Sequence, residues 1–505
     1  MAIIINSNEI TKKQHNFWNH LHFHPTDAIE DEWGKRILDE VAKDGVANTV
    51  RMYAMLEDIV TEKDGVLCYD FTENDVRLDY MVKKGFNILL SYNFIPPFLA
   101  LTPDNNAAFA KNKTRYKGKY IVASIPRDYS IWQEICRVYT EHILERYGED
   151  TVSNWYLQCY NEPDIGFFMA EAGGLEEGAA KRLPEYIKLY KGFANGAEEA
   201  FKNKNVTKPM KIGGPALAHY LNFFEGFLNY VKTSGTRLDF ICTHTYGTYP
   251  DALTSNEKPL NIENTYEHYI RYRKVIDKYF PDTEFILDEW GACSAGFVDC
   301  ETHPKMIFRE TEIFSAYYAK MITKFIERDV KLSKMLICHS GQHEMTWDFM
   351  GFRHFISLNF IKKPIYNAYI LGTKLYENIL SHTEPSENTD ILATKSNGGK
   401  YSVLVTYSSD NFDRELPDVS QTIRLEGMED GTKNITLWRI DKHNTNPYNL
   451  FCEKDFPKEI NDQQKKALRE EGTLKPVTYT AKCEGGVLEI DEVLCNNGVL
   501  LIEIA

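Results

Sequence analysis

The sequence predicts a (β/α)8 barrel followed by a C-terminal antiparallel β-sandwich, and three observations lead to this fold class. Between residues 15 and 380, eight short runs of β-branched or aromatic residues alternate with longer amphipathic segments, as expected of repeated βα units. Beyond residue 400 the apolar residues recur at every second position, which favours antiparallel strands. An open doubly wound sheet is the alternative, but the first run lacks the Gly-rich phosphate turn of that fold.

The eight runs are the expected barrel strands. Amphipathic segments such as DEWGKRILDEVAKDG (31–45) and SIWQEICRVYTEHILERYGED (130–150) separate them, and a further helix is expected near 364–380. A chain of 505 residues accommodates such a barrel together with a smaller domain. The expected strands lie at residues 15–24, 47–53, 86–94, 155–163, 210–217, 238–246, 284–291 and 334–340.

The second domain begins after a polar, turn-rich stretch at 381–400. Six alternating segments follow it, from YSVLVTYS at 401–408 to GVLLIEI at 498–504. The opening residues AIIIN also have strand character, and we expect them to pair with this domain. The predicted organisation is therefore an N-terminal strand in 1–14, a catalytic barrel in 15–380 and a sandwich in 381–505. The polar insert at 452–472 is expected to be a surface extension, available for contact with a neighbouring subunit in a homo-oligomer.

Composition narrows the classes of partner. Asp and Glu outnumber Lys and Arg by 73 to 58, giving a net charge of −15 and no basic tract for a nucleic-acid backbone. No run approaches the roughly 20 apolar residues of a membrane-spanning helix. The ten cysteines include no C-x-x-C pair, which favours free thiols in a reducing compartment. We expect a cytoplasmic protein without a cofactor, and leave open the removal of an export signal.

Two glutamates end predicted strands of the barrel. Glu162 follows the fourth strand in the segment Asn161-Glu162-Pro163-Asp164, and Glu289 ends the seventh. Because active sites of such barrels lie at the carboxyl ends of the strands, both side chains are expected at one mouth. Two facing carboxylates are what glycoside hydrolysis requires. Asp288 precedes Glu289, and in a regular strand only one of this pair can point inward.

The histidines allow a different interpretation. His20, His22 and His24 alternate in the first predicted strand, so they share one face and suggest a metal-dependent barrel hydrolase. Strand four has no obvious metal-bridging lysine, however, and the Asn-Glu-Pro segment would then have no role. We therefore expect no metal, and place His22 and His24 at the rim of a sugar pocket and His20 in the core. A non-catalytic sugar-binding protein is a second alternative, which the presence of both glutamates disfavours.

Longer segments carry a family resemblance. ILERYGEDTVSNWYLQCYNEPD, KIGGPAL, LDFICTHTY, FILDEWG, KKPIYNAYILGTKL and WRIDKHNTNPYNLF occur in this order and span nearly the whole chain. Together they resemble glycoside hydrolase family 39, the β-xylosidase and α-L-iduronidase family of clan A. The resemblance implies a retaining mechanism with Glu162 as acid/base and Glu289 as nucleophile. It further implies that Asn161 binds the sugar 2-hydroxyl and that Tyr246 steadies the nucleophile.

Departures from the family pattern concern the substrate. The usual I-T-E is Leu287-Asp288-Glu289 here, R-G-H-G is Arg51-Met52-Tyr53-Ala54, and strand three reads SYNFIP instead of a glutamate-containing segment. CHSGQHEMTWDF replaces the aromatic floor near strand eight, with Trp347 as a substitute from the loop. We therefore expect an exo-acting, β-xylosidase-like enzyme on plant-type oligosaccharides with an altered glycone pocket; α-L-arabinosidase, β-galactosidase and uronidase specificities stay open. The expected substrate-binding residues are Asn161, His244, Tyr246, Arg51, Tyr53, His22, His24, Trp290, His339 and Trp347.

Overall fold

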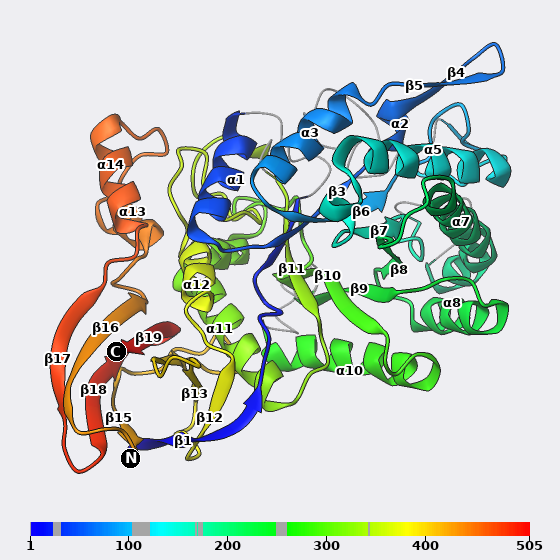
Figure 1. The fold of residues 1–505 in the computed structure, drawn as a ribbon. Helices are drawn as coiled ribbons and strands as arrows, with labels where there is room; N and C mark the ends of the chain where they lie inside the picture. The colour runs from blue at the N-terminus through cyan, green and yellow to red at the C-terminus, as the bar shows by residue number, and fades with distance from the viewer. Residues whose placement is uncertain are drawn as a thin grey trace.

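The computed structural model describes residues 2–23, 32–103, 122–166, 169, 175–248, 260–341 and 344–505. Within these residues, eight parallel strands close a barrel in the order β10-β11-β2-β3-β6-β7-β8-β9 (Figure 1). Each of the eight sequence segments contributes one strand, and the predicted fold class is confirmed. The barrel strands are β2 (His20–Phe23), β3 (Thr49–Tyr53), β6 (Asn87–Tyr92), β7 (Tyr156–Cys159), β8 (Lys211–Leu217), β9 (Phe240–Thr248), β10 (Glu284–Cys293) and β11 (Lys334–His339).

Helices cover the outside of the barrel (Figure 1). In α5, Asp128 caps the first turn by accepting hydrogen bonds from the backbone N–H groups of Ser130 and Ile131, and Gly148 ends the helix at φ 76°. Its buried side chains recur at helical spacing, so one face packs on the sheet. The long helices are α1 (Glu32–Asp44), α3 (Thr72–Lys83), α5 (Tyr129–Tyr147), α7 (Leu175–Asn203), α8 (Leu221–Ser234), α10 (Ile262–Tyr279), α11 (Glu312–Glu327) and α12 (Pro364–Gly372). Shorter elements are α2 (Leu56–Ile59), α6 (Glu149–Val152), the 3-10 helix η1 (Pro304–Glu310) and the hairpin β4 (Val60–Lys63) and β5 (Val66–Tyr69).

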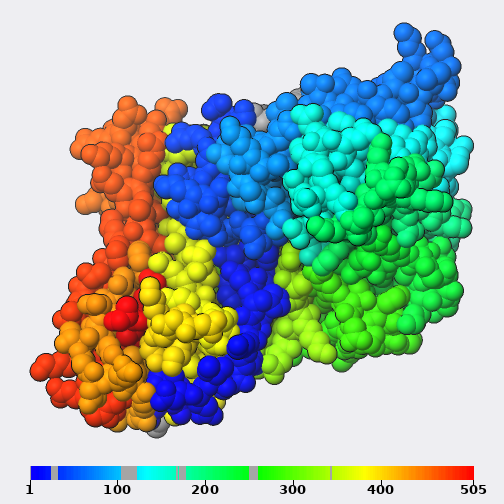
Figure 2. Space-filling view, viewed as in Figure 1, coloured from blue at the N-terminus to red at the C-terminus, as the bar shows by residue number. Residues whose placement is uncertain are grey.

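The second sheet contains both ends of the chain. In the described part its strand order is β17-β16-β19-β14-β13-β12-β1-β15-β18. β1 pairs antiparallel with β12 and parallel with β15, and Figure 2 shows the first residues, in dark blue, against yellow and orange atoms of the C-terminal part. The strands are β1 (Ile3–Lys13), β12 (Asn378–His382), β13 (Thr389–Lys395), β14 (Tyr401–Tyr407), β15 (Val419–Glu426), β16 (Gly431–Ile440), β17 (Val477–Cys483), β18 (Val487–Leu494) and β19 (Gly498–Ile504).

The stretch at 381–400 is more structured than its composition suggests. It contains β13, which pairs with β14 along its whole length and is buried at six of its seven positions. A strand buried on both faces lacks the polar alternation that marks a half-exposed strand. The sequence therefore concealed this strand among turn residues.

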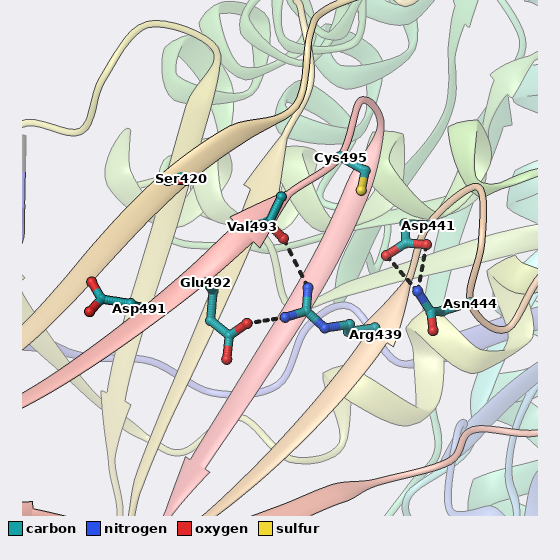
Figure 3. A pocket seen from close by; sticks show the side chains of 8 residues that line it. All are labelled: Ser420, Arg439, Asp441, Asn444, Asp491, Glu492, Val493 and Cys495. Atoms are coloured by element: carbon teal, nitrogen blue, oxygen red, sulfur yellow. Dashed lines mark hydrogen bonds and ion pairs between the residues drawn. The ribbon is translucent and has the colours of Figure 1, made fainter.

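A side chain bridges β16 to β18, which is an end strand of the second sheet. Arg439 of β16 donates a hydrogen bond to the backbone carbonyl of Val493 in β18 at 3.0 Å and pairs with Glu492 of the same strand, as Figure 3 shows. Edge strands expose unpaired backbone groups. Arg439 satisfies one such carbonyl at the polar pocket drawn there.

The insert at 452–472 forms most of a small helical extension, α13 (Pro447–Glu453) and α14 (Asp462–Glu471). Asn461 and Gln464 form a capping box at the start of α14. Phe451 of α13 packs against Phe349 and Trp347, with ring centroids 5.1 and 6.0 Å apart. The extension thus covers the loop that follows β11. Among the helices described, none combines the length and apolar character needed to cross a membrane.

Candidate active site

The site lies at the carboxyl ends of the barrel strands. Phe240 and Cys242 of β9 belong to an apolar cluster of barrel residues that also contains Ile286 and Leu336. Since alternate residues of a strand share a face, His244 and Tyr246 of β9 continue this inward row. The same alternation turns Arg51 and Tyr53 of β3 inward.

Glu162 stands on a turn with an unusual backbone. Tyr160 and Glu162 have φ values of 64° and 45°, in the left-handed region that non-glycine residues seldom adopt. Two sets of hydrogen bonds hold this turn. The N–H of Glu162 donates to the carbonyl of Ala216 at 3.0 Å, and the Asp164 carboxylate accepts from three successive backbone N–H groups, those of residues 218–220. Strain concentrated at such a residue is typical of functional sites.

Asp288 and Glu289 both face the barrel interior, contrary to the expectation for a regular strand. The pairing of β10 with β9 shifts between Leu287 and Glu289, which marks a β-bulge. Consequently Arg51 contacts both carboxylates, with its Nε 3.2 Å from Asp288 Oδ2 and its Nη1 2.8 Å from Glu289 Oε1. The bulge adds a second inward anion to the site.

Glu289 is surrounded by hydrogen-bond donors. Besides Arg51, the hydroxyl of Tyr246 donates to Glu289 Oε2 at 2.8 Å, and His22 Nδ1 lies 3.2 Å from Oε1. Burial alone would raise the pKa of Glu289, but the positive charges around it, above all that of His244, hold the pKa well below its usual value. Glu289 is therefore a carboxylate at neutral pH.

Glu162 has the opposite tendency. Burial raises the pKa of Glu162 and the anionic Glu289 adds to this effect, although the charge of His244 opposes it. The two glutamates and His244 each place one ligand atom within 4.8 Å of the others, and His244 Nδ1 is 2.7 Å from Glu162 Oε1. The site thus pairs a carboxyl group whose pKa is raised with a carboxylate at close range.

His244 lies between three carboxyl groups. Its Nε2 is 3.4 Å from Asp288 Oδ2 and its Nδ1 is 3.6 Å from Glu289 Oε2. Burial opposes a charged imidazole, but Glu289 and Asp288 overcome this and raise the pKa of His244 to about 10. The imidazole is accordingly cationic.

A match to a family model covers residues 1–485 of the chain, and the family is described as glycosyl hydrolases family 39. The chain belongs to this family. It is a glycosidase, and its substrate is a carbohydrate.

Similar proteins agree with this assignment. A β-xylosidase of Caldicellulosiruptor saccharolyticus is 24% identical over 99% of this chain and 96% of its own length. A monomeric β-xylosidase from Caulobacter crescentus CB15 has a solved structure with a TM-score of 0.80 and 19% identity, covering 100% of this chain and 99% of that one. A bacterial orthologue of human α-L-iduronidase reaches a TM-score of 0.75 at 17% identity, covering 100% and 83%.

Most of the sequence-predicted residues of this family 39 chain lie together. Arg51 Nη2 donates to Asn161 Oδ1 at 2.7 Å, which fixes the amide beside Glu162. The rings of His22 and Tyr53 stack with centroids 5.5 Å apart. His24 lies outside the described residues.

Trp290, His339 and Trp347 are not brought into this cluster, and their contact with sugar stays a prediction. Trp290 follows the bulge on the outward face, where it packs against Phe314 and Tyr318 of α11. His339 also faces outward, against Phe355 at 4.3 Å, because β11 turns its neighbour Cys338 inward. Trp347 packs beneath the helical extension and donates through Nε1 to Glu301.

Sequence reasoning missed two residues of the site. Gln158 of β7 accepts from Arg51 Nε at 2.9 Å and donates to Asp288 at 2.7 Å. The available signal was its position in the predicted fourth strand, two residues before Tyr160. Arg353, from the loop after β11, donates to the Tyr246 hydroxyl at 2.8 Å. No periodicity points to Arg353, since it lies in an irregular segment.

Among the residues that the structure describes, two groups of side chains have metal-ligand chemistry, His22 with Glu289 and Cys338, and Glu162 with His244 and Glu289. Both use Glu289, whose oxygens already accept from Arg51 and Tyr246. A divalent cation at either place would face the Arg51 guanidinium and the charged His244 at close range. The hydrogen-bond donors around Glu289 therefore suit a carboxylate that acts on a substrate, and they suit a metal ligand less well.

Proposed function

We propose that this family 39 enzyme is a retaining, exo-acting β-xylosidase-like glycosidase in which Glu289 is the nucleophile and Glu162 the acid/base. One observation carries the proposal: two carboxyl groups with oxygens less than 5 Å apart have pKa values displaced in opposite directions. A separation of about 5 Å leaves no room for a water between sugar and carboxylate, and it is typical of retaining enzymes.

In the first step, Glu289 Oε2 or Oε1 attacks the anomeric carbon while the bond to the leaving oxygen breaks. Glu162 transfers its proton to that oxygen. Arg51 and Tyr246 hold the attacking carboxylate in position. The product is a glycosyl ester of Glu289, and Glu162 is left as a carboxylate.

In the second step, a water oxygen attacks the anomeric carbon while Glu162 takes a proton from that water molecule. The ester bond breaks, and Glu289 regains its charge. Two displacements at one carbon restore the original anomeric configuration. Both residues then have the protonation states with which they began.

The glycone is proposed to lie over Asn161, His22 and Tyr53. Asn161 stands beside Glu162, where its amide can meet the 2-hydroxyl, and His22 offers an imidazole to another hydroxyl. The relatives named as β-xylosidases make xylose the first candidate. The residues around this pocket depart from the family pattern, so its hydroxyl contacts are expected to differ.

Arg353 favours a second candidate, a glycone that carries a carboxylate. Its side chain is buried and donates to Tyr246 and Ser340, and among the described residues no carboxylate forms an ion pair with it. A buried guanidinium that no carboxylate contacts directly suits a uronic acid. A relative by fold is described as an α-L-iduronidase orthologue.

The test is a panel of aryl glycosides of β-D-xylose, α-L-arabinose, β-D-galactose and uronic acids, with NMR observation of the first-formed anomer. We expect the highest kcat/KM with the xyloside and retention of configuration. A preference for the uronide of at least tenfold would establish the second candidate. Inversion, or an absence of turnover across the panel, would overturn the mechanism.

A further inference from the structure

We propose that Asp288 is a positioning residue that keeps His244 doubly protonated through both steps, so that Glu162 stays a carboxylate in the glycosyl-enzyme. This inference rests on the proposed function, which it deepens. It concerns a residue where the family pattern has threonine, as I-T-E, and this chain has aspartate. The argument starts from the geometry of the imidazole.

His244 faces carboxyl groups through both ring nitrogens. Nδ1 is 2.7 Å from Glu162 Oε1 and Nε2 is 3.4 Å from Asp288 Oδ2. A neutral imidazole carries one proton and can donate to only one of them, whereas its other nitrogen would turn a lone pair toward an anion. Once Glu162 has given up its proton, it and Asp288 are two facing carboxylates, and they select the imidazolium. In the free enzyme the anions that favour it are Asp288 and Glu289.

Asp288 is held in place for this role. It is fully buried, accepts from Gln158 Nε2 at 2.7 Å and lies 3.2 Å from Arg51 Nε. The bulge in β10 turns it inward. Burial would raise the pKa of Asp288, but the charges of Arg51 and His244 lower it below its usual value, so it is an anion.

The charged groups around His244 come from three elements. Glu162 follows β7, Asp288 and Glu289 lie on β10, and the Arg51 guanidinium lies on β3 behind the two β10 carboxylates. On β9 itself, burial raises the pKa values of Cys242 and Tyr246 well above their usual ranges, so both are neutral. In the free enzyme, both β10 carboxylates support the imidazolium.

The intermediate removes one of these anions. When Glu289 becomes an ester it has no charge, and Asp288 is then the anion facing Nε2. Without Asp288 the buried imidazolium would have Glu162 alone to balance it, while Arg51 would repel it. Transfer of its proton to Glu162 would neutralise both groups, and the base of the second step would be lost.

The decisive experiment observes His244 in the trapped intermediate. Histidine labelled with 15N is incorporated, Glu289 is esterified with 2,4-dinitrophenyl 2-deoxy-2-fluoro-β-D-xyloside, and the ring nitrogens are followed by NMR between pH 5 and 8. We expect the imidazolium signature in free and trapped enzyme. A neutral His244 in the labelled enzyme would overturn this inference alone. Failure of the fluoroglycoside to label Glu289 would overturn the proposed function, and this inference with it.

A set of variants tests the same point by kinetics. Asp288→Asn preserves shape and removes the charge, Asp288→Glu preserves the charge, and Cys242→Ser alters the same buried layer without a change of charge. For kcat with an activated aryl xyloside, where the second step limits, we expect Asp288→Asn to move the acid limb up by about one pH unit. The acid limb of Cys242→Ser should keep the wild-type position. The acid limb of Asp288→Glu should lie closer to the wild-type position than that of Asp288→Asn. An unshifted limb in a folded Asp288→Asn enzyme would refute the role.

Discussion

The ends of β7 and β10 carry the same type of side chain in opposite states. Glu289 lies in a strand with its side chain 7% exposed, and it accepts hydrogen bonds from Arg51 and Tyr246. Glu162 sits on a strained turn, 17% exposed, with His244 as its hydrogen-bond partner. The chemistry of a carboxyl group is thus decided by the donors that its strand neighbours supply. Strand position alone does not distinguish nucleophile from acid.

Removal of the Glu289 carboxylate should have the largest effect. Glu289→Ala eliminates the attacking atom, so turnover of every aryl glycoside should fall by on the order of 10⁴-fold or more. Circular dichroism should show an unchanged fold. A folded variant with full activity would exclude Glu289 from the mechanism.

Removal of the β7 carboxyl should depend on the leaving group. Glu162→Ala should lose about 10²–10⁴-fold of the first-step rate, measured as kcat/KM, on alkyl or sugar aglycones, because these need a proton. It should lose far less on 2,4-dinitrophenyl glycosides, which depart without one. Equal losses for both classes would contradict the role of Glu162 as an acid.

The pH profile separates the two carboxyl groups. For kcat/KM, the acid limb should report ionisation of Glu289 and the basic limb deprotonation of Glu162. Arg353 helps to lower the pKa of Glu289, so Arg353→Met should move the acid limb to higher pH and leave the basic limb nearly in place. Movement of the basic limb alone would show that these two assignments are reversed.

The smallest effect is expected at the support of the β7 turn. Asp164→Asn keeps an oxygen acceptor but weakens the bonds to backbone N–H groups after β8, and we expect the free energy of unfolding to fall by about 1–3 kcal/mol. Denaturant titration measures this loss, and kcat should change only a few-fold. A loss of activity as large as that of Glu162→Ala would mean that catalysis depends on the exact backbone position of the turn after β7.

The sequence by itself determined the barrel, since the alternation of apolar runs with amphipathic segments marks each strand, and strand ends drew attention to Glu162, Glu289, His244 and Tyr246. Tertiary structure decided the rest. The bulge that turns Asp288 inward and the outward placement of Trp290 depend on strand register, which pairing with β9 sets and local pattern does not. Arg353 reaches the site from an irregular loop, and only the packing of that loop places it beside Tyr246. The charge states also belong to the fold, because a pKa depends on groups that meet only when distant strands close the barrel.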